Sequence, residues 1–318
     1  FPATHLKTTQ NHTNNSQAPP PPQYKLHKRV EAAHDDPEWR ACWTAKGKIV
    51  TGSVDNTVKV WDAENMVAEH ELTGHDLGVI DVAVNGAGDL AASTSFDSTI
   101  KIWNLENGTC TSTIATSAAE SWAIAFSPSA RHLATTTHAG NVALYSVDSG
   151  SLETTFESSA KKFGLSVAYT EDGETLAMSA MDGSITVFDV ATGAIKASFT
   201  AHAKPVRSLS FSPSGFLMAA SDDMHVSALS VDNNEVIYSI VAHSSWVLDV
   251  TATADGAHFA TSSSDKEVKI WDVMGNPAPV HVFHGHTDQV WSVAYDVTGS
   301  KLVSAGDDAA IQVYDCPT

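Results

Sequence analysis

Histidine, serine and aspartate recur together in this sequence, and together they can perform nucleophilic catalysis, as in the hydrolase triad. In three sets a tryptophan follows as well: His34, Ser53, Asp55, Trp61; His75, Ser95, Asp97, Trp103; and His243, Ser263, Asp265, Trp271. An active site is needed once, whereas a structural brace is needed in every repeat. The repetition therefore predicts a buried chain of hydrogen bonds, from Asp to His, His to Ser and Ser to Trp.

No other pattern favours chemistry. The fifteen histidines are scattered, and none has the spacing of metal ligands on one element. A unique cluster of titratable residues, which an enzyme would need, is not evident. We therefore expect no catalytic residue, no metal site and no cofactor.

These sets belong to a repeat that runs through the chain. Successive landmark dipeptides are 41 to 43 residues apart, and an Asp stands six residues before each, except before the third, where Ala139 replaces it. A period of about 40–45 residues with Trp-Asp signatures predicts four-stranded propeller blades. The fold class is thus an all-β, seven-bladed propeller. The dipeptides are Trp61-Asp62, Trp103-Asn104, Tyr145-Ser146, Phe188-Asp189, Leu229-Ser230, Trp271-Asp272 and Tyr314-Asp315.

The two ends of the repeat complement each other. The last unit stops at Thr318, without room for a fourth strand, while residues 24–30 resemble a strand that has no blade of its own. We expect residues 24–30 to complete the last blade and close the ring, which removes open sheet edges. The domain prediction is a propeller over residues 24–318, preceded by a disordered tail of polar residues and prolines over 1–23. Because the sequence begins at Phe1, we expect the natural start to be missing or processed.

Composition narrows the function classes. The net charge is −19, from 18 basic and 37 acidic residues, so a direct nucleic-acid interface is not expected. No apolar run is long enough for a membrane span. Three widely separated cysteines and the lack of a secretory signal favour a reducing compartment, cytoplasm or nucleus.

These signatures resemble the WD-repeat family over residues 24–318. Within it, the chain is similar to the small WD-repeat subunits of the superkiller complex, which also occur in the Paf transcription elongation complex. The matching segments are residues 202–209, 243–248 (HSSWVL), 262–273 (SSSDKEVKIWDV) and the ending 314–317 (YDCP).

That resemblance implies a non-catalytic scaffold. Its partners would be a helical-repeat protein that carries an RNA helicase, in an assembly that feeds mRNA to the exosome for 3′-5′ decay, and transcription elongation subunits in the nucleus. The alternative is a substrate receptor of a ubiquitin ligase. Receptors of one such class carry Arg two residues after a Trp-Asp dipeptide, where this chain has Glu64 and Met274.

The resemblance also implies where partners bind. The fifth residue after each His or its equivalent would emerge near the mouth of the central channel, and in this chain six of these seven residues are large and apolar. Trp246, Phe96 and Met181 would lie on the same face. Exposed apolar residues with Trp and Arg are typical of binding hot spots. The candidate partner-binding residues are Trp39, Ile80, Phe96, Trp122, Leu165, Met181, Arg207, Trp246, Leu248 and Trp291; sealing of the blades beneath loops is the competing interpretation.

Overall fold

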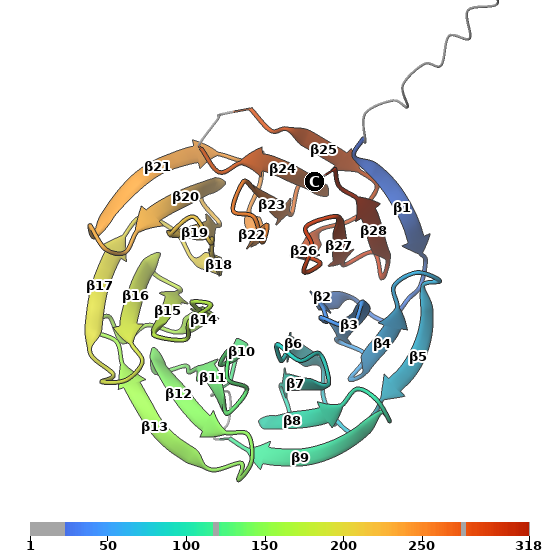
Figure 1. The fold of residues 1–318 in the computed structure, drawn as a ribbon, viewed down its shortest axis with the longest axis horizontal. Coiled ribbons are helices and arrows are strands. Elements are labelled where there is room, and N and C mark those ends of the chain that lie inside the picture. Colours follow the sequence, from blue (N-terminus) through green and yellow to red (C-terminus); the bar gives the residue numbers. More distant parts are fainter. Residues whose placement is uncertain (1–22, 117–120, 275–277, 318) are drawn as a thin grey trace, which may run out of the picture.

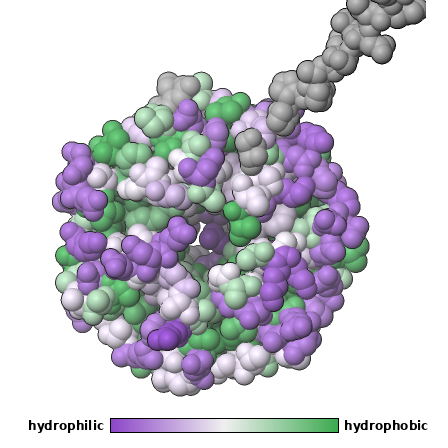
Figure 2. Space-filling model, in the orientation of Figure 1, coloured by the Kyte–Doolittle hydropathy of each residue, from purple (hydrophilic) through white to green (hydrophobic). Residues whose placement is uncertain are grey.

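The computed structural model describes residues 23–116, 121–274 and 278–317, and every regular element in these ranges is a β-strand. No helix in these ranges has the length and hydrophobicity to cross a membrane. Seven four-stranded antiparallel sheets stand around a central channel (Figure 1), and the space-filling view shows the hollow at its centre (Figure 2). The seven-bladed propeller predicted from the repeat is confirmed. The predicted disordered tail lies, except for Gln23, outside the described residues.

Each sheet is one blade, numbered here in chain order by its innermost strand. Blades 1 to 4 consist of β2 (Glu38–Trp43), β3 (Lys48–Ser53), β4 (Val58–Asp62) and β5 (Val67–Leu72); β6 (Val79–Val84), β7 (Leu90–Ser95), β8 (Thr99–Asn104) and β9 (Thr109–Ala115); β10 (Ile124–Phe126), β11 (His132–Thr136), β12 (Asn141–Ser146) and β13 (Leu152–Glu157); β14 (Gly164–Tyr169), β15 (Thr175–Ala180), β16 (Ser184–Asp189) and β17 (Ile195–Thr200).

Blades 5 to 7 follow the same order from the channel outward, but the outermost strand of blade 7 comes from the start of the chain. They consist of β18 (Val206–Phe211), β19 (Phe216–Ser221), β20 (His225–Ser230) and β21 (Glu235–Val241); β22 (Val247–Ala252), β23 (His258–Ser263), β24 (Glu267–Asp272) and β25 (His281–His284); β26 (Val290–Tyr295), β27 (Lys301–Gly306), β28 (Ile311–Asp315) and β1 (Lys25–Val30).

The ring closes where the N-terminal strand pairs with the C-terminal one. Strand β1 runs antiparallel to β28, with Leu26 opposite Tyr314 and Val30 opposite Ile311. In Figure 1 the blue strand lies directly outside the darkest red one. Lys25 adds an ion pair to Asp315 at 3.3 Å. The predicted closure is therefore confirmed.

A hydrogen-bond chain recurs in blades 1, 2, 6 and 7, where the histidine, the aspartate and a hydroxyl group are all present. The hydroxyl group that takes part in it is not that of the predicted serine. In blade 1, His34 Nδ1 lies 2.9 Å from the Asp55 carboxylate, and the indole N–H of Trp61 donates to the Thr51 hydroxyl at 2.9 Å. Because the carboxylate can only accept, Nδ1 carries the proton, and Nε2 accepts from the Thr51 hydroxyl at 2.8 Å. Ser93 and Thr261 have the same partners in blades 2 and 6, whereas in blade 7 Ser304 contacts His286 and the hydroxyl of Tyr314.

The prediction that Ser53, Ser95 and Ser263 link His to Trp was wrong. Ile49 lies opposite Trp61, so Thr51 is its diagonal neighbour on the same face, whereas Ser53 is two residues farther away. Ser53 instead donates to the carbonyl of Asp36 and accepts from the amide of Asp55. It therefore shapes the turn that presents the aspartate, as do Ser95 and Ser263 in their blades.

Blade 5 carries an incomplete version of this brace. His202 contacts Asp223 at 2.9 Å, but its Nε2 is buried without a hydrogen-bond partner. The hydroxyl position is occupied by Ala219 and the aromatic position by Leu229. Blades 3 and 4 lack the histidine altogether. Within the described residues, blades 3 to 5 therefore carry less of this hydrogen-bond chain than the other four blades.

Candidate functional site

The seven residues predicted at the channel mouth line one cavity of about 180 Å³. Six of them are the second residue of an innermost strand, and Trp122 lies two residues before β10, because the chain enters every blade on this face. They are Trp39, Ile80, Trp122, Leu165, Arg207, Leu248 and Trp291. The structure thus places them together, on the face that the resemblance implied.

β-Bulges aim six of these side chains. In six innermost strands the pairing register with the neighbouring strand shifts at one residue, and that residue is the one at the channel mouth. In β2 the shift falls at Trp39, between Glu38 and Arg40, and in β26 it falls at Trp291. The others are Ile80, Leu165, Arg207 and Leu248. A bulge inserts an extra residue and re-aims its side chain. These residues therefore leave the alternation that buries Ala41 and Trp43 in the core.

Aromatic rings form one connected cluster at the mouth. Trp39 packs against Trp291 and Trp122, with ring centroids 5.6 and 6.5 Å apart. Phe96 meets the rings of Trp39 and Trp122 edge-on at 5.8 and 6.0 Å. Phe163, which the sequence analysis missed, extends the cluster from Trp122 at 5.2 Å. Such edge-to-face contacts hold bulky side chains in place before any partner arrives.

The candidate residues differ in accessibility. Phe96, Met181 and Trp246 are 46%, 47% and 44% exposed, whereas Leu165 and Leu248 are each only 4% exposed. The two leucines are therefore walls of the cavity and cannot act as exposed anchors. The tryptophans at positions 39, 122 and 291 are half-buried, which suits a contact surface whose side chains are already ordered.

Arg207 is held by its own chain. Its Nε and Nη2 donate to the two carboxylate oxygens of Asp222 at 2.9 and 2.8 Å, and its guanidinium lies 5.9 Å from the ring centroid of Trp246. The guanidinium is thus within reach of a cation–π contact with Trp246. Its carboxylate partner, however, is already supplied within the molecule.

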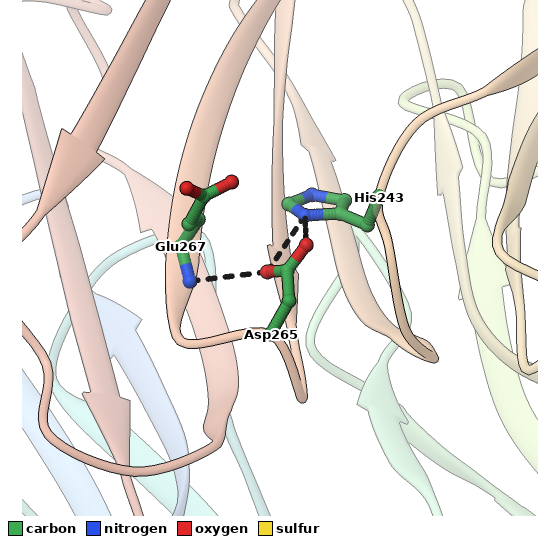
Figure 3. Close-up of side chains that lie close together, drawn as sticks. All are labelled: His243, Asp265 and Glu267. Atoms are coloured by element: carbon green, nitrogen blue, oxygen red, sulfur yellow. Dashed lines mark hydrogen bonds and ion pairs between the residues drawn. The ribbon is translucent and has the colours of Figure 1, made fainter.

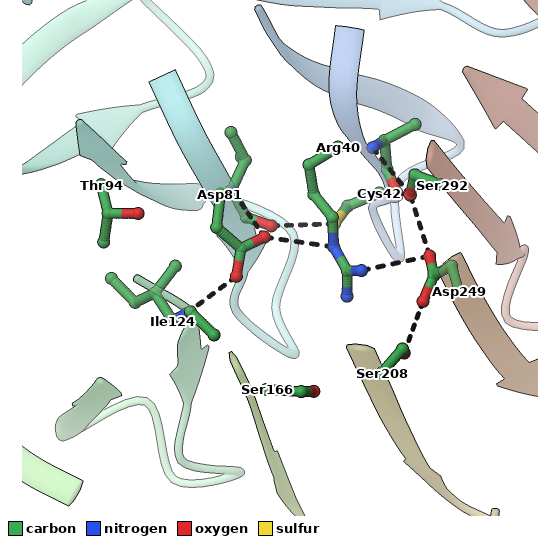
Figure 4. Close-up of polar contacts among 12 residues, drawn as sticks. Arg40, Cys42, Asp81, Thr94, Ile124, Ser166, Ser208, Asp249 and Ser292 are labelled. Atoms are coloured by element: carbon green, nitrogen blue, oxygen red, sulfur yellow. Dashed lines mark hydrogen bonds and ion pairs between the residues drawn. The ribbon is translucent and has the colours of Figure 1, made fainter. Parts of the chain in front are cut away.

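Below the mouth, a polar network links the innermost strands across the channel (Figure 4). Arg40 contacts Asp81 at 3.2 Å and Asp249 at 3.1 Å. Asp249 also accepts hydrogen bonds from the hydroxyls of Ser208 at 2.6 Å and Ser292 at 3.1 Å. Asp81 accepts from a backbone amide of blade 3 at 2.8 Å. Burial raises the pKa of Asp81, although Arg40 opposes that shift.

This network was not predicted from the sequence, although a signal for it is present there. The residue immediately after each channel-mouth residue is polar or small in every unit: Arg40, Asp81, Ala123, Ser166, Ser208, Asp249 and Ser292. A strict alternation of buried and exposed residues, without bulges, gives no reason to single out these positions.

One triad among the described residues could bring three metal-ligand atoms within 4.8 Å: His243, Asp265 and Glu267 (Figure 3). Its contacts identify it as the brace of blade 6. The histidine Nδ1 bonds to Asp265 at 2.9 Å and its Nε2 to Thr261 at 2.8 Å, so both ring nitrogens are engaged. Burial lowers the pKa of His243, which keeps the ring neutral and suited to this pairing.

Comparison with known families agrees with this architecture. A family model described as "WD domain, G-beta repeat" matches residues 25–62, 67–104, 193–227, 234–272 and 277–315, which is more than half of the chain. The chain belongs to the WD-repeat family.

Relatives with curated names add detail. This WD-repeat chain is 39% identical to the WD repeat-containing protein SL1-17 of Schistosoma mansoni over 292 residues, 89% of the chain and 96% of that protein. It is 36% identical to Superkiller complex protein 8 of Dictyostelium discoideum over 83 residues, 26% of the chain and 27% of that protein. It is 31% identical to the COMPASS component SWD3 of Saccharomyces cerevisiae over 119 residues, 37% of each. WD-repeat propellers are generally interaction scaffolds and typically not enzymes.

One buried acid departs from the WD-repeat pattern at the blade 7–blade 1 seam. Glu38 begins the innermost strand, where four other blades have Val79, Val206, Val247 and Val290, and like them it is fully buried. Neither oxygen of its carboxyl has a hydrogen-bond partner among the described residues. Burial, with Asp308 and Asp55 nearby, raises the pKa of Glu38 from its usual 4.5 to about 8.

We expect Glu38→Val to stabilise the protein, and more so at higher pH. Below pH 4.5 the Glu38 carboxyl is protonated in both the folded and the unfolded protein. As pH rises from 4.5 toward 8, the carboxyl ionises in the unfolded protein but stays protonated in the folded one, so the folded protein loses stability. The gain in unfolding free energy should be roughly 2–3 kcal/mol at pH 8, since an unpaired buried acid is removed, and smaller at pH 5. Denaturant unfolding at both pH values measures it. Glu38→Gln is the control, because it removes the titration but keeps an unpaired polar group. A gain that does not change with pH for Glu38→Val would contradict the assignment.

Proposed function

We propose that this chain is a non-catalytic scaffold that binds a protein partner through its channel-mouth face. The supporting observation is the connected cluster of Trp39, Trp122 and Trp291 around one cavity, bordered by the exposed Phe96 and Trp246. Tryptophan and arginine in a partly enclosed apolar setting are typical of interface hot spots. Exposed aromatic residues also exceed what sealing the blades would require.

We further propose that the partner is a helical-repeat protein that carries an RNA helicase, as the resemblance to superkiller subunits implies. Two observations support this: the matching segments, including the ending 314–317, and the similarity to Superkiller complex protein 8. In this role the protein supports exosome-mediated 3′-5′ mRNA decay in the cytoplasm. A second assembly, with transcription elongation subunits of the Paf type, would place it in the nucleus as well.

Copurification from the cells that make the protein, followed by mass spectrometry, tests this assignment. We expect the helical-repeat protein and the helicase to be recovered in comparable amounts, with elongation subunits in a nuclear fraction. Recovery of a ubiquitin ligase adaptor in their place would favour the substrate-receptor alternative. Recovery of other COMPASS components would instead favour the relationship to that relative.

A further inference from the structure

A second, larger hollow opens at the other end of the channel. Its volume is about 890 Å³. It is lined by the ends of the innermost strands in blades 4 to 7, by the turns that follow them and, farther from the channel, by Thr175, Lys196, Val231 and Asp232. The channel-mouth residues stand at the starts of these strands, so the hollow faces the opposite side. We call it the acidic hollow.

The charges around the acidic hollow are one-sided. Lys196 is the single basic residue in its lining, whereas five residues carry carboxylates: Glu171, Asp172, Glu174, Asp232 and Asp296. The Lys196 ammonium donates to the hydroxyl of Thr175 at 2.9 Å. The side chains of Glu171, Glu174 and Asp232 make no ion pair or hydrogen bond within the part of the chain that the structure describes. The corresponding turns of blades 1 and 3 carry Lys46 and Arg131, so this charge is not a general property of the face.

Aromatic side chains form the inner wall of the hollow. Tyr169, Phe211 and Tyr295 stand at the ends of β14, β18 and β26, and all three are only half-buried. The Tyr169 hydroxyl is buried and has no hydrogen-bond partner among the described residues. Phe126, at the equivalent place in blade 3, is buried. Tyr169, Phe211 and Tyr295 pack against the core clusters of the blades as well as lining the hollow.

We propose that the acidic hollow binds an arginine-rich segment of a protein partner. A guanidinium can stack on an aromatic face while its fork of N–H groups pairs with a carboxylate. Lysine offers only a point charge, so arginine is better suited to a site that combines aromatic rings with carboxylates. The net charge of −19 would speed the approach of such a segment. This proposal does not depend on the channel-mouth face, which lies on the other side.

Fluorescence anisotropy with a labelled eight-residue peptide of alternating Arg and Ser tests the proposal on the full chain. The peptide should bind saturably, and the peptide with Lys in place of Arg should bind at least several-fold more weakly. The triple variant Glu171→Gln, Glu174→Gln, Asp232→Asn should weaken Arg-peptide binding by tenfold or more. The matched control is Glu64→Gln, Glu106→Gln, Asp148→Asn, which removes the same charge from exposed residues on the same face of blades 1 to 3.

The control triple should change the affinity by less than about twofold. An equal loss of affinity in both triples would show non-specific attraction to an acidic body and would overturn the proposal. Absence of saturable binding to the unaltered chain would overturn it as well. Because the substituted residues are exposed, both triples should keep the melting temperature of the parent.

Discussion

Removal of residues 24–30 should make the protein aggregate, or should lower its melting temperature far below that of a chain beginning at Tyr24. Strand β1 supplies the whole outer edge of blade 7. Val30 packs against the core cluster between blades 7 and 1, and Lys25 pairs with Asp315. Without β1, the ladder groups of β28 become an unpaired edge beside the apolar Val313 and Tyr314, which invites edge-to-edge association.

Calorimetry and light scattering on two shortened chains measure this effect. The chain that begins at Tyr24 lacks only residues before the first strand and should melt like the full chain. The chain that begins at Glu31 should aggregate, seen as light scattering, or unfold at a much lower temperature than the chain that begins at Tyr24. Equal melting temperatures for the two would mean that β1 is a dispensable addition and that the ring is held elsewhere.

Trp271→Ala should lower the unfolding free energy by about 3–5 kcal/mol, as expected for a large aromatic removed from a packed core. Trp271 is 1% exposed and stacks on Phe259 with ring centroids 6.2 Å apart. Its indole N–H donates to the Thr261 hydroxyl, which also contacts His243. The substitution therefore creates a cavity and removes one member of the brace.

The matched control for this prediction is Trp246→Ala in the same blade. Trp246 is 44% exposed, so its loss should cost less than about 1 kcal/mol. Asp265→Ala should fall between the two, at about 1–3 kcal/mol, because it leaves the His243 Nδ1–H unpaired in a buried site. Chemical denaturation of all three variants gives the comparison. Unchanged midpoints for Trp271→Ala and Asp265→Ala would show that the brace does not hold the blade.

The sequence was sufficient for the fold because its information is periodic. The landmark dipeptides and the preceding aspartates recur at the spacing of four-stranded propeller blades. The single segment 24–30, which has no blade of its own, predicts the closure once the strands of each unit are counted. The channel-mouth residues could be chosen because they occupy one repeat position. Their shared cavity of about 180 Å³ agrees with that choice, while their role in binding stays a prediction.

The errors and omissions arose where geometry departs from simple alternation. Which hydroxyl reaches the tryptophan depends on diagonal pairing in the sheet, so Ser53 could not be separated from Thr51 by spacing alone. The bulges at Trp39 and its equivalents leave no mark in the residue types. The contacts of Arg40 with Asp81 and Asp249 join residues up to 209 positions apart, and a single sequence does not reveal such pairs.

The central claim, that the channel-mouth face binds the partner, is tested most directly with Trp122→Ala. Binding to the helical-repeat subunit and melting temperature should be measured on the same preparation, with Trp291→Ala as a second variant. Leu152→Ala is the control, an exposed apolar residue on an outermost strand. Loss of one hot-spot tryptophan costs about 2 kcal/mol or more, roughly a thirtyfold weaker affinity. For both tryptophan variants we predict an affinity weakened by this factor and a melting temperature close to that of the parent. A steep fall in melting temperature, with full affinity in the fraction that stays folded, would contradict the claim.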